Sequence, residues 1–506
     1  MPLVTKQLPD DPAQLKTLLL KERSANENLK QQIRSLLEAL RLEKHRLYGK
    51  SSEKAPDQSE LFNEADTCLD EIDCVDDKAP AVELKPTPKK ERPTRKPLPS
   101  DLPRVRYVIE LSEEERQCSC GCTLVEIGED ISEQVDIIPV QVQVTQYVRK
   151  KYACKNCDDT IKIAPKANVL LPKSIASGNT MAYIITSKYV DGLPLYRLSS
   201  ILDRYGIELS RQTLSESVVK VAEKIEPLIS RIRQQLMKSS VLFMDETRVQ
   251  VLNEPGKTPQ SNSYMWVQRG GPPGKPIVQF HYDPGRSTAT AARLLNGFTG
   301  TLMTDGYKPY RQVAKSQGLN HLCCWAHSRR KFMEAQKAQP KGKTGKADMA
   351  ISFIGKLYGV EKQSQGGDAA TRHRIRQQIS VPVLKQFHTW LLKSQQQIPP
   401  KTALGKAVNY TLEYWPELSR YIENGEWPID NNPAENAIRP FVIGRKAWLF
   451  SNSQRGAAAS ANLYGLVETA KANGKEPYSY LSWLFEKLPR ADMDNVELLM
   501  PWNMPG

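Results

Sequence analysis

From residue 240 onward the chain alternates short apolar runs with turn signals, and this order limits the folds it can form. "SVLFMDETRVQV", "SYMWVQRGG" and "PIVQFHYDPGRS" have the pattern of three strands, and a helix-like "STATAARLL" follows them. "TGTLMTDGYKPY" has the pattern of a fourth strand, and "LNHLCCWAHSRRKF" that of a strand leading into a basic helix. This succession predicts a mixed α/β sheet.

Three acidic residues stand at notable points of this pattern. Asp245 lies on the first strand, Asp305 ends the fourth, and Glu435 lies in "IDNNPAENAIRP". An aspartate that ends a strand is a common turn former, so neither aspartate is informative alone. Glu435 also has an ordinary explanation. Asn432 suits an N-cap, Pro433 suits the first helical position, and Glu435 would complete a capping box at the third.

Together, the three carboxylates predict a site for phosphodiester chemistry. Two divalent cations held by three carboxylates can activate a nucleophile and stabilise the leaving oxygen. Mg²⁺ or Mn²⁺ prefers oxygen ligands and keeps several waters, so few protein ligands suffice. Glu246 should point to the opposite sheet face from Asp245, and we do not expect it to be a ligand. The long interval between Asp305 and Glu435 implies an insertion, which has the pattern of an all-α segment.

Residues 12–47 carry a heptad-like pattern. Asn26 sits on the apolar seam, and an Asn at a coiled-coil core position fixes register and strand number. An amphipathic helix packed on its own protein is the alternative, because only about four heptads are available. The seam consists of Leu15, Leu19, Leu29, Ile33, Leu36, Leu40 and Leu47.

Two cysteine knuckles, "CSCGC" and "YACKNC", flank the alternating run "VQVQVTQYV" at 140–148, which predicts a strand. Thiolates in this arrangement suit one structural zinc, because a small sheet cannot hold itself together alone. Reduced cysteines without metal are the alternative. Four of the following five residues are the expected ligands: Cys118, Cys120, Cys122, Cys154 and Cys157.

Residues 179–235 are helical in pattern. "LPLYRLSSILDRYG", a short turn and a helix capped by Ser210 have the outline of a helix-turn-helix. Its second helix would present Arg211 and Gln212 to DNA. A plain helical hairpin fits almost as well.

The composition favours a polyanionic partner. Lys and Arg outnumber Asp and Glu by 71 to 57 in 506 residues, a net charge of +14. The N-terminal segment lacks the features of a signal peptide, and no apolar run approaches the roughly 20 residues that span a bilayer. We therefore expect a cytosolic protein in which the nine cysteines bind metal or stay reduced.

Further candidates surround the acidic residues. Cys324 and His327 have a Cys-x-x-His spacing that could bind metal, but no second pair lies nearby in sequence. We expect Cys323 and Cys324 to pack at a strand end. His327, Arg329 and Arg330 are expected to face the active site or a phosphate.

A basic cluster and an indole follow Glu435 closely. Basic groups beside a metal site suit a DNA backbone, and an indole can stack on an unpaired base. Surface charge and a core tryptophan are the ordinary alternatives. The residues concerned are Arg439, Arg445, Lys446 and Trp448.

Several motifs resemble signatures of the insertion sequence 66 family of transposases, which are of the Asp-Asp-Glu class with an RNase H-like catalytic core. They are "MDET", "TDGY", "CWAHSRRKF" and "DNNPAENAIRPFVIGRKAWLFSNS". The zipper-like helix, the finger and "GAAASANLYGLVETAKANG" resemble that family in the same order. The resemblance covers nearly the whole chain outside 55–103, and the compressed "CSCGC" knuckle departs from it.

The resemblance implies that Asp245, Asp305 and Glu435 form the catalytic, metal-binding triad, with two Mg²⁺ or Mn²⁺ ions per active site beside one structural Zn²⁺. It implies transposon-end and target DNA as substrates of a homo-oligomer, a dimer or larger. Accessory proteins encoded by the same element are further candidate partners, and no membrane is involved. The expected location is the bacterial cytoplasm, at the nucleoid.

The expected fold is multidomain α+β, with an RNase H-like α/β catalytic core that carries an all-α insertion. The expected domains are a leucine-zipper-like coiled-coil helix (1–54), a flexible linker (55–103), a small β zinc finger (104–165), a helical helix-turn-helix-like region (166–236), the core in two parts (237–339 and 428–474), the insertion (340–427) and a C-terminal helical tail (475–506).

Two other interpretations compete with a transposase. A catalytically inactive zinc-finger and helix-turn-helix protein derived from a transposase would bind DNA, but it has no need for three acidic residues in a basic chain. A coiled-coil scaffold explains the first 50 residues and nothing after residue 240.

The finger provides a direct test. The module should hold one zinc, and Cys154→Ser should release it and unfold residues 110–165, because ligation supplies the folding free energy. Metal analysis of the purified protein checks this, and an absence of zinc would contradict the prediction.

Overall fold

The computed structural model describes residues 11–48, 142–153, 161–339, 345–491 and 495–505. The predicted linker and the five candidate zinc ligands lie outside these ranges. The chain divides into two compact units, residues 77–148 and the remainder, and the helices and strands below belong to the second unit.

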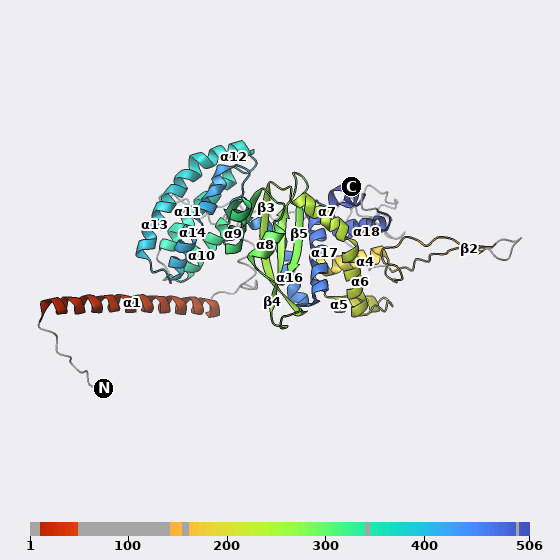
Figure 1. Ribbon diagram of the computed structural model, residues 1–506, viewed down its shortest axis with the longest axis horizontal. Helices are drawn as coiled ribbons and strands as arrows, with labels where there is room; N and C mark the ends of the chain where they lie inside the picture. Colours follow the sequence, from red (N-terminus) through yellow and green to blue (C-terminus); the bar gives the residue numbers. More distant parts are fainter. Residues whose placement is uncertain (1–10, 49–141, 154–160, 340–344, 492–494, 506) are drawn as a thin grey trace, which may run out of the picture. The chain divides into compact units, whose positions relative to one another are not determined.

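A mixed sheet lies between layers of helices in the larger unit (Figure 1). Its main strands follow the order β5-β4-β3-β6-β7, and a short strand, β8, also pairs with β3. β3, β4 and β5 run antiparallel, whereas β6 and β7 run parallel to β3. The mixed sheet predicted from the apolar runs is confirmed. The strands are β3 (Val241–Asn253), β4 (Asn262–Gly270), β5 (Ile277–Asp283), β6 (Thr301–Thr304), β7 (Asn320–Cys323) and β8 (Ser451–Ser453).

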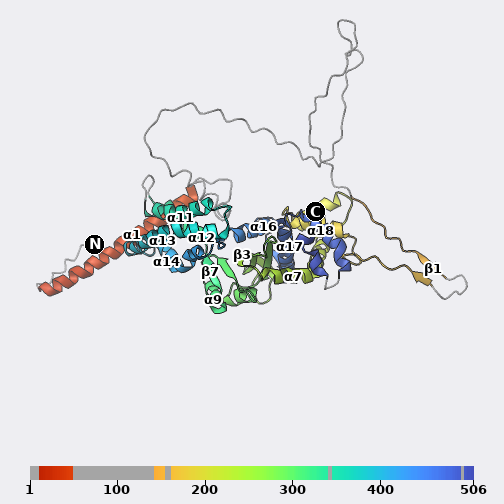
Figure 2. The same cartoon turned by 90° about the horizontal axis from the view of Figure 1, so that it is seen from above.

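Helices cover both faces of the sheet (Figures 1 and 2). On one face, Trp266 of β4 meets Tyr310 edge to face, with ring centroids 6.0 Å apart. On the other face, Phe280 of β5 packs against Phe441 and Tyr464. The first face carries α8 (Thr288–Leu294) and α9 (Lys308–Gln317), and the second carries α16 (Asn432–Trp448) and α17 (Gln454–Ala472).

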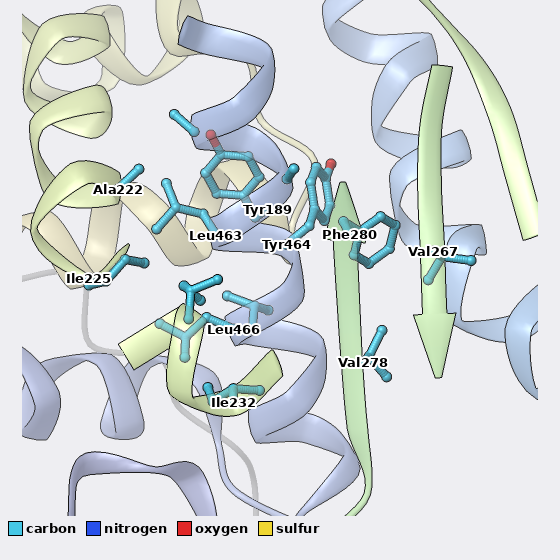
Figure 3. Close-up of a cluster of buried hydrophobic side chains, with 14 of the residues drawn as sticks. Tyr189, Ala222, Ile225, Ile232, Val267, Val278, Phe280, Leu463, Tyr464 and Leu466 are labelled. Carbon is cyan, nitrogen blue, oxygen red and sulfur yellow. The ribbon is translucent and has the colours of Figure 1, made fainter. Parts of the chain in front are cut away.

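α17 is buried between the sheet and a layer of helices (Figure 3). Leu463 and Leu466 contact the helical layer, while Tyr464 meets Phe280 of β5. A Cβ at Gly465 would lie 3.3 Å from the backbone nitrogen of Phe280, so glycine permits this close approach. The layer comprises α4 (Gly178–Tyr189), α5 (Leu195–Asp203), α6 (Arg211–Lys224), α7 (Glu226–Leu236) and α18 (Pro477–Lys487), and short 3-10 turns follow it at Leu488–Arg490, Val496–Leu499 and Pro501–Asn503.

The predicted cap of α6 is confirmed. The hydroxyl of Ser210 accepts a hydrogen bond from the backbone N–H of Thr213 at 3.1 Å. Arg211 and Gln212 follow this cap and are exposed, so the start of α6 faces solvent.

The insertion is helical throughout its described residues and has a hydrophobic core of its own. Phe387 lies at its centre and stacks on Phe353 at 5.0 Å. Trp325 joins this core, and its indole N–H donates to the carbonyl of Leu418 at 2.7 Å. The helices of the insertion are α11 (Lys346–Gln363), α12 (Ala369–Ile375), a π-helix (Arg376–Ser380), α13 (Val381–Gln397), α14 (Ala403–Glu413), α15 (Trp415–Ser419) and a 3-10 turn (Arg420–Glu423), and they pack on α10 (Trp325–Lys337) of the core.

The strand predicted over 140–148 is wrong for the described part of that run. Residues 142–150 form no regular secondary structure and are exposed. Strand pairing occurs instead between β1 (Lys151–Ala153) and β2 (Ile161–Ile163). Alternation predicts a strand only where a partner strand and a core exist to bury one face, and the residues that the structure describes provide neither for 142–148.

None of the helices in the described ranges combines the length and the hydropathy that a membrane span requires.

The predicted N-terminal helix is present as α1 (Pro12–Tyr48). Its apolar seam is largely exposed: Leu19 is 66% and Leu36 70% accessible to solvent. The helix also touches its own chain, since the backbone N–H of Ala403 donates to Glu38 at 3.1 Å. Self-association through the exposed seam stays a prediction.

Deleting residues 1–50 should therefore weaken self-association or the pairing of two DNA ends, while the remainder stays folded. Light scattering measures the mass of the protein in solution, and native gels measure the complexes that contain two DNA ends. The Asn26→Leu change should tighten association but loosen its stoichiometry. An unchanged mass and unchanged paired complexes after deletion would contradict the assembly role.

Candidate active site

The sheet register brings Asp245 and Asp305 side by side. Phe243 of β3 lies opposite Met303 of the parallel strand β6, and Asp305 follows the end of β6 near enough for its charge to act on Asp245. Asp245 also pairs with Val267, whereas Glu246 pairs with Trp266. Because cross-strand partners share a face, Asp245 points toward α16 and Glu246 toward α9.

Glu435 lies on α16, near enough to Asp245 for its charge to act on that residue. The helix follows Asn431, a fully buried residue whose side-chain amide donates to the carbonyl of Met244 at 2.9 Å. Arg269 of β4 donates to the carbonyl of Pro433 at 2.9 Å. These two bonds fasten the start of α16 to the strands beside Asp245.

The capping box predicted for Glu435 is wrong. The helix begins at Asn432 rather than Pro433, and its N-cap, Asn431, makes no side-chain capping bond. The physical reason is competition: the amide of Asn431 is directed to the backbone of β3 instead of to its own helix. Glu435 thus lies four residues after the N-cap.

The three carboxylates interact strongly. Burial raises the pKa of Asp245 well above its ordinary value, and the negative charges of Glu246, Asp305 and Glu435 raise this pKa further. Burial also raises the pKa of Asp305, although the backbone N–H of Tyr307 and nearby cations oppose the rise. Carboxylates that repel one another in this way fit a cation, because a cation removes the repulsion.

Glu246 has separate partners on the opposite face. It pairs with Arg286 and accepts a hydrogen bond from the hydroxyl of Tyr310. The guanidinium of Arg286 stacks on the ring of Tyr307, 3.6 Å from its centroid. Burial, followed by the charge of Asp305, raises the pKa of Glu246 to about 7. Glu246 therefore fixes Arg286 behind Asp305, a role that the sequence did not indicate.

Glu435 is 2% exposed and has two contacts on α10. Nδ1 of His327 lies 3.4 Å from Oε1 of Glu435, and a guanidinium nitrogen of Arg330 lies 3.6 Å from Oε2. Burial lowers the pKa of His327 to about 3, so the imidazole is neutral. Cys323 and Cys324 are buried at the end of β7, as predicted.

The insertion also reaches the site. Gly306, next to Asp305, lies against the ring of Tyr410 of α14, and a Cβ at Gly306 would lie 2.8 Å from Cζ of Tyr410. The ammonium group of Lys331 lies over the same ring, 4.5 Å from its centroid. Neither Tyr410 nor Lys331 was singled out in the sequence, because only tertiary packing brings α14 of the insertion and α10 of the core to Asp305.

The basic residues predicted to contact DNA differ in how far they are exposed to solvent. Arg439 and Arg445 are half-buried, and Lys446 is exposed. Arg445 donates to the hydroxyl of Thr247 at 3.2 Å, on the same strand as Asp245. Arg329 is 1% exposed and contacts the sulfur of Met333, so it lies in the interior rather than on an accessible surface.

Lys188 of α4 connects two of the predicted DNA-contact regions. Its ammonium group lies 5.6 Å from the ring centroid of Trp448, and Trp448 also packs edge to face on Phe441. Burial, followed by the charge of Arg211, lowers the pKa of Lys188 to about 8. The start of α6 and the end of α16 therefore lie close together. No sequence motif indicated Lys188.

Four family models match the chain in order. The model for "Transposase IS66 family" matches residues 173–459, and "zinc-finger binding domain of transposase IS66" matches 115–158. "Transposase C of IS166 homeodomain" matches 35–106, and "IS66 C-terminal element" matches 465–502. These matches support a structural zinc and DNA as a partner.

Two curated relatives come from Sinorhizobium fredii. Uncharacterized protein y4qI is 31% identical over 543 aligned residues, which cover 99% of each chain. Uncharacterized protein y4jD is 32% identical over 424 residues, which cover 80% of this chain and 81% of the relative. No solved structure matches the chain significantly. With its central model matching residues 173–459, the chain belongs to the IS66 family of transposases.

Proposed function

We propose that this chain is a DNA transposase that cleaves and joins strands at a metal site formed by Asp245, Asp305 and Glu435. The observation that carries the proposal is the electrostatic effect of Asp305 and Glu435 on the buried Asp245, with the three residues coming from β3, the residue after β6, and α16. Surface carboxylates avoid one another, so their gathering in a buried position points to cation binding.

The strand order supports an RNase H-like core. Three antiparallel strands followed by two parallel ones, in the order β5-β4-β3-β6-β7, are the arrangement expected of that fold. The first aspartate then lies on the central strand and the second on its parallel neighbour, which is where this fold holds its acidic residues. A fold shared with nucleases and transposases does not by itself imply catalysis. The three carboxylates are the residues that would carry out the reaction.

The donor set fits Mg²⁺ or Mn²⁺, because all three ligands offer hard oxygen atoms. Two cations bound there would supply activation of the attacking hydroxyl and stabilisation of the leaving oxygen. Arg330 and His327 orient Glu435, and Glu246 with Arg286 supports the side of Asp305. Lys331 and Lys446 provide positive charge for phosphates of the bound strand.

DNA binding would extend from this site to α6. Arg211, Gln212 and Lys188 lie at the start of α6 or beside it, and Trp448 lies under Lys188. Such a surface offers cations for phosphates and an indole for an unpaired base. We further propose that a dimer or larger assembly, joined through α1, holds both transposon ends at the nucleoid. Accessory proteins of the same element remain candidate partners.

Glu435→Gln separates catalysis from folding. The variant should fold, keep the finger zinc and bind transposon-end DNA, because the lost helix-dipole interaction is only about 0.3–1 kcal/mol. It should no longer cleave or join labelled end DNA in Mg²⁺, because a neutral amide is a poor ligand for a hard cation. Asp245→Asn and Asp305→Asn should behave alike, and combining the substitutions should add little.

Glu417→Gln is the matched control. Glu417 is a buried glutamate of the insertion that pairs with Arg311 and lies outside the proposed triad. This control should retain cleavage. If Glu435→Gln cleaves as well as the control does, the carboxylate is not a metal ligand. If the unsubstituted protein binds end DNA but never cleaves it, the inactive DNA-binding interpretation replaces the enzyme.

The raised pKa values predict how stability depends on pH. The pKa of Glu246 is about 7 in the folded protein, against an ordinary value of 4.5, and that of Asp245 is also raised. The folded state therefore binds protons more tightly than the unfolded state. The free energy of unfolding without added Mg²⁺ should fall as the pH rises from 4.5 to 7.

Mg²⁺ should reverse this trend, because it binds the ionised carboxylates. Thermal unfolding should show a larger rise in Tm on adding Mg²⁺ above pH 7 than near pH 5, and Asp245→Asn should abolish the rise. Asp203→Asn, at an exposed position in α5, is the control and should keep it. A Tm that is insensitive to Mg²⁺ at every pH would contradict cation binding.

A further inference from the structure

Cys324, His327 and Glu435 bring three kinds of metal ligand to one point. The sulfur of Cys324, a ring nitrogen of His327 and a carboxylate oxygen of Glu435 all lie within 4.8 Å of one another. The sequence offers only the Cys-x-x-His pair, and the third group comes from α16, more than a hundred residues later. The cluster is distinct in chemistry from the three carboxylates, although it shares Glu435 with them.

The spacing is close to that of a tetrahedral zinc site. With zinc–ligand bonds of about 2.0–2.3 Å, neighbouring ligand atoms lie about 3.4–3.7 Å apart. Nδ1 of His327 and Oε1 of Glu435 are 3.4 Å apart, so this pair already has the required separation. Within the described chain, this buried nitrogen makes no hydrogen bond. The sulfur of Cys324 lies within 4.8 Å of the other two ligand atoms. It needs to move closer to them by about 1 Å, which a side-chain rotation can supply.

The backbone holds the three residues together. Cys324 is the N-cap of α10, and His327 lies on the first turn of that helix. The N–H of Trp325 donates to the carbonyl of Ile429 at 3.2 Å, which ties this helix start to the segment before α16. The N–H of Asn431 donates to the sulfur of Cys324 at 3.2 Å. This bond holds the sulfur beside the segment that leads into α16, the helix that carries Glu435.

We propose that Cys324, His327 and Glu435 bind a zinc-class ion, with a fourth position left open on the side of His327. Glu435 and Cys324 are buried, whereas the His327 side chain is 20% exposed and gives access to solvent. Thiolate and imidazole select zinc over magnesium. The consequence rests on the proposed function: an ion held here takes an oxygen of Glu435 away from the Mg²⁺ site and inhibits strand cleavage.

Zinc stoichiometry tests the site without reference to activity. The full chain is equilibrated with a zinc buffer, and bound metal is counted per chain. The unsubstituted protein should bind one more zinc than Cys324→Ser and His327→Gln, because losing one ligand should weaken affinity at least about 10-fold. The zinc of the finger is common to all variants and cancels in the comparison.

Cys323→Ser is the matched control, because Cys323 is an adjacent buried cysteine that is not part of the cluster. It should bind as much zinc as the unsubstituted protein. Equal stoichiometry in all four proteins would overturn the proposal. Circular dichroism confirms that each variant is folded, and His327→Gln keeps the test valid if Cys324→Ser does not fold.

Inhibition is tested by adding zinc to cleavage reactions at fixed Mg²⁺, with each protein compared with its own zinc-free rate. The unsubstituted protein and Cys323→Ser should lose activity at zinc concentrations at least about 10-fold lower than Cys324→Ser. Identical zinc sensitivity would overturn the inhibitory role. A protein that binds the additional zinc but never cleaves DNA would overturn the proposed function and leave this metal site standing.

Discussion

Asp245 is buried where the charges of Asp305 and Glu435 both act on it, and holding these buried charges near one another costs free energy that the surrounding contacts must offset. Asp245 is fixed within β3, and Asp305 directly follows β6, the parallel neighbour of that strand. The start of α16, which carries Glu435, is tied to the sheet by the buried amide of Asn431 on β3 and by Arg269 of β4. Because an unpaired buried amide is itself costly, the Asn431 bond helps to set the position of α16.

Much of the sheet could be predicted from the sequence, because the strands are apolar runs and their turns carry strong signals. The positions of Asp245 and Asp305 follow from the strands that hold them. The start of α16 could not be predicted in the same way. Local rules favoured a capping box at Asn432, whereas the structure uses Asn431 for a contact with Met244 far away in sequence. Local propensity is overridden where a long-range bond competes for the same side chain.

The remaining differences have the same origin. The run at 142–148 alternates like a strand but is exposed and has no partner strand. Arg329 belongs to a basic motif, yet its position on α10 directs it into the interior. Lys188 belongs to no motif and still reaches Trp448, because α4 packs near the end of α16. The sequence pattern indicates which residues are apolar, polar or charged. Tertiary packing decides which other residues each of them contacts.

The contact between Gly306 and Tyr410 has a consequence for how such a protein can be shortened. The insertion has its own hydrophobic core and resembles a module that could be excised. However, its Tyr410 fills the space above Gly306, immediately beside Asp305. Removing the insertion would open that space to water and free the turn that carries the aspartate. A minimal version of this core therefore needs another aromatic side chain in that space, and the insertion is best regarded as part of the candidate site.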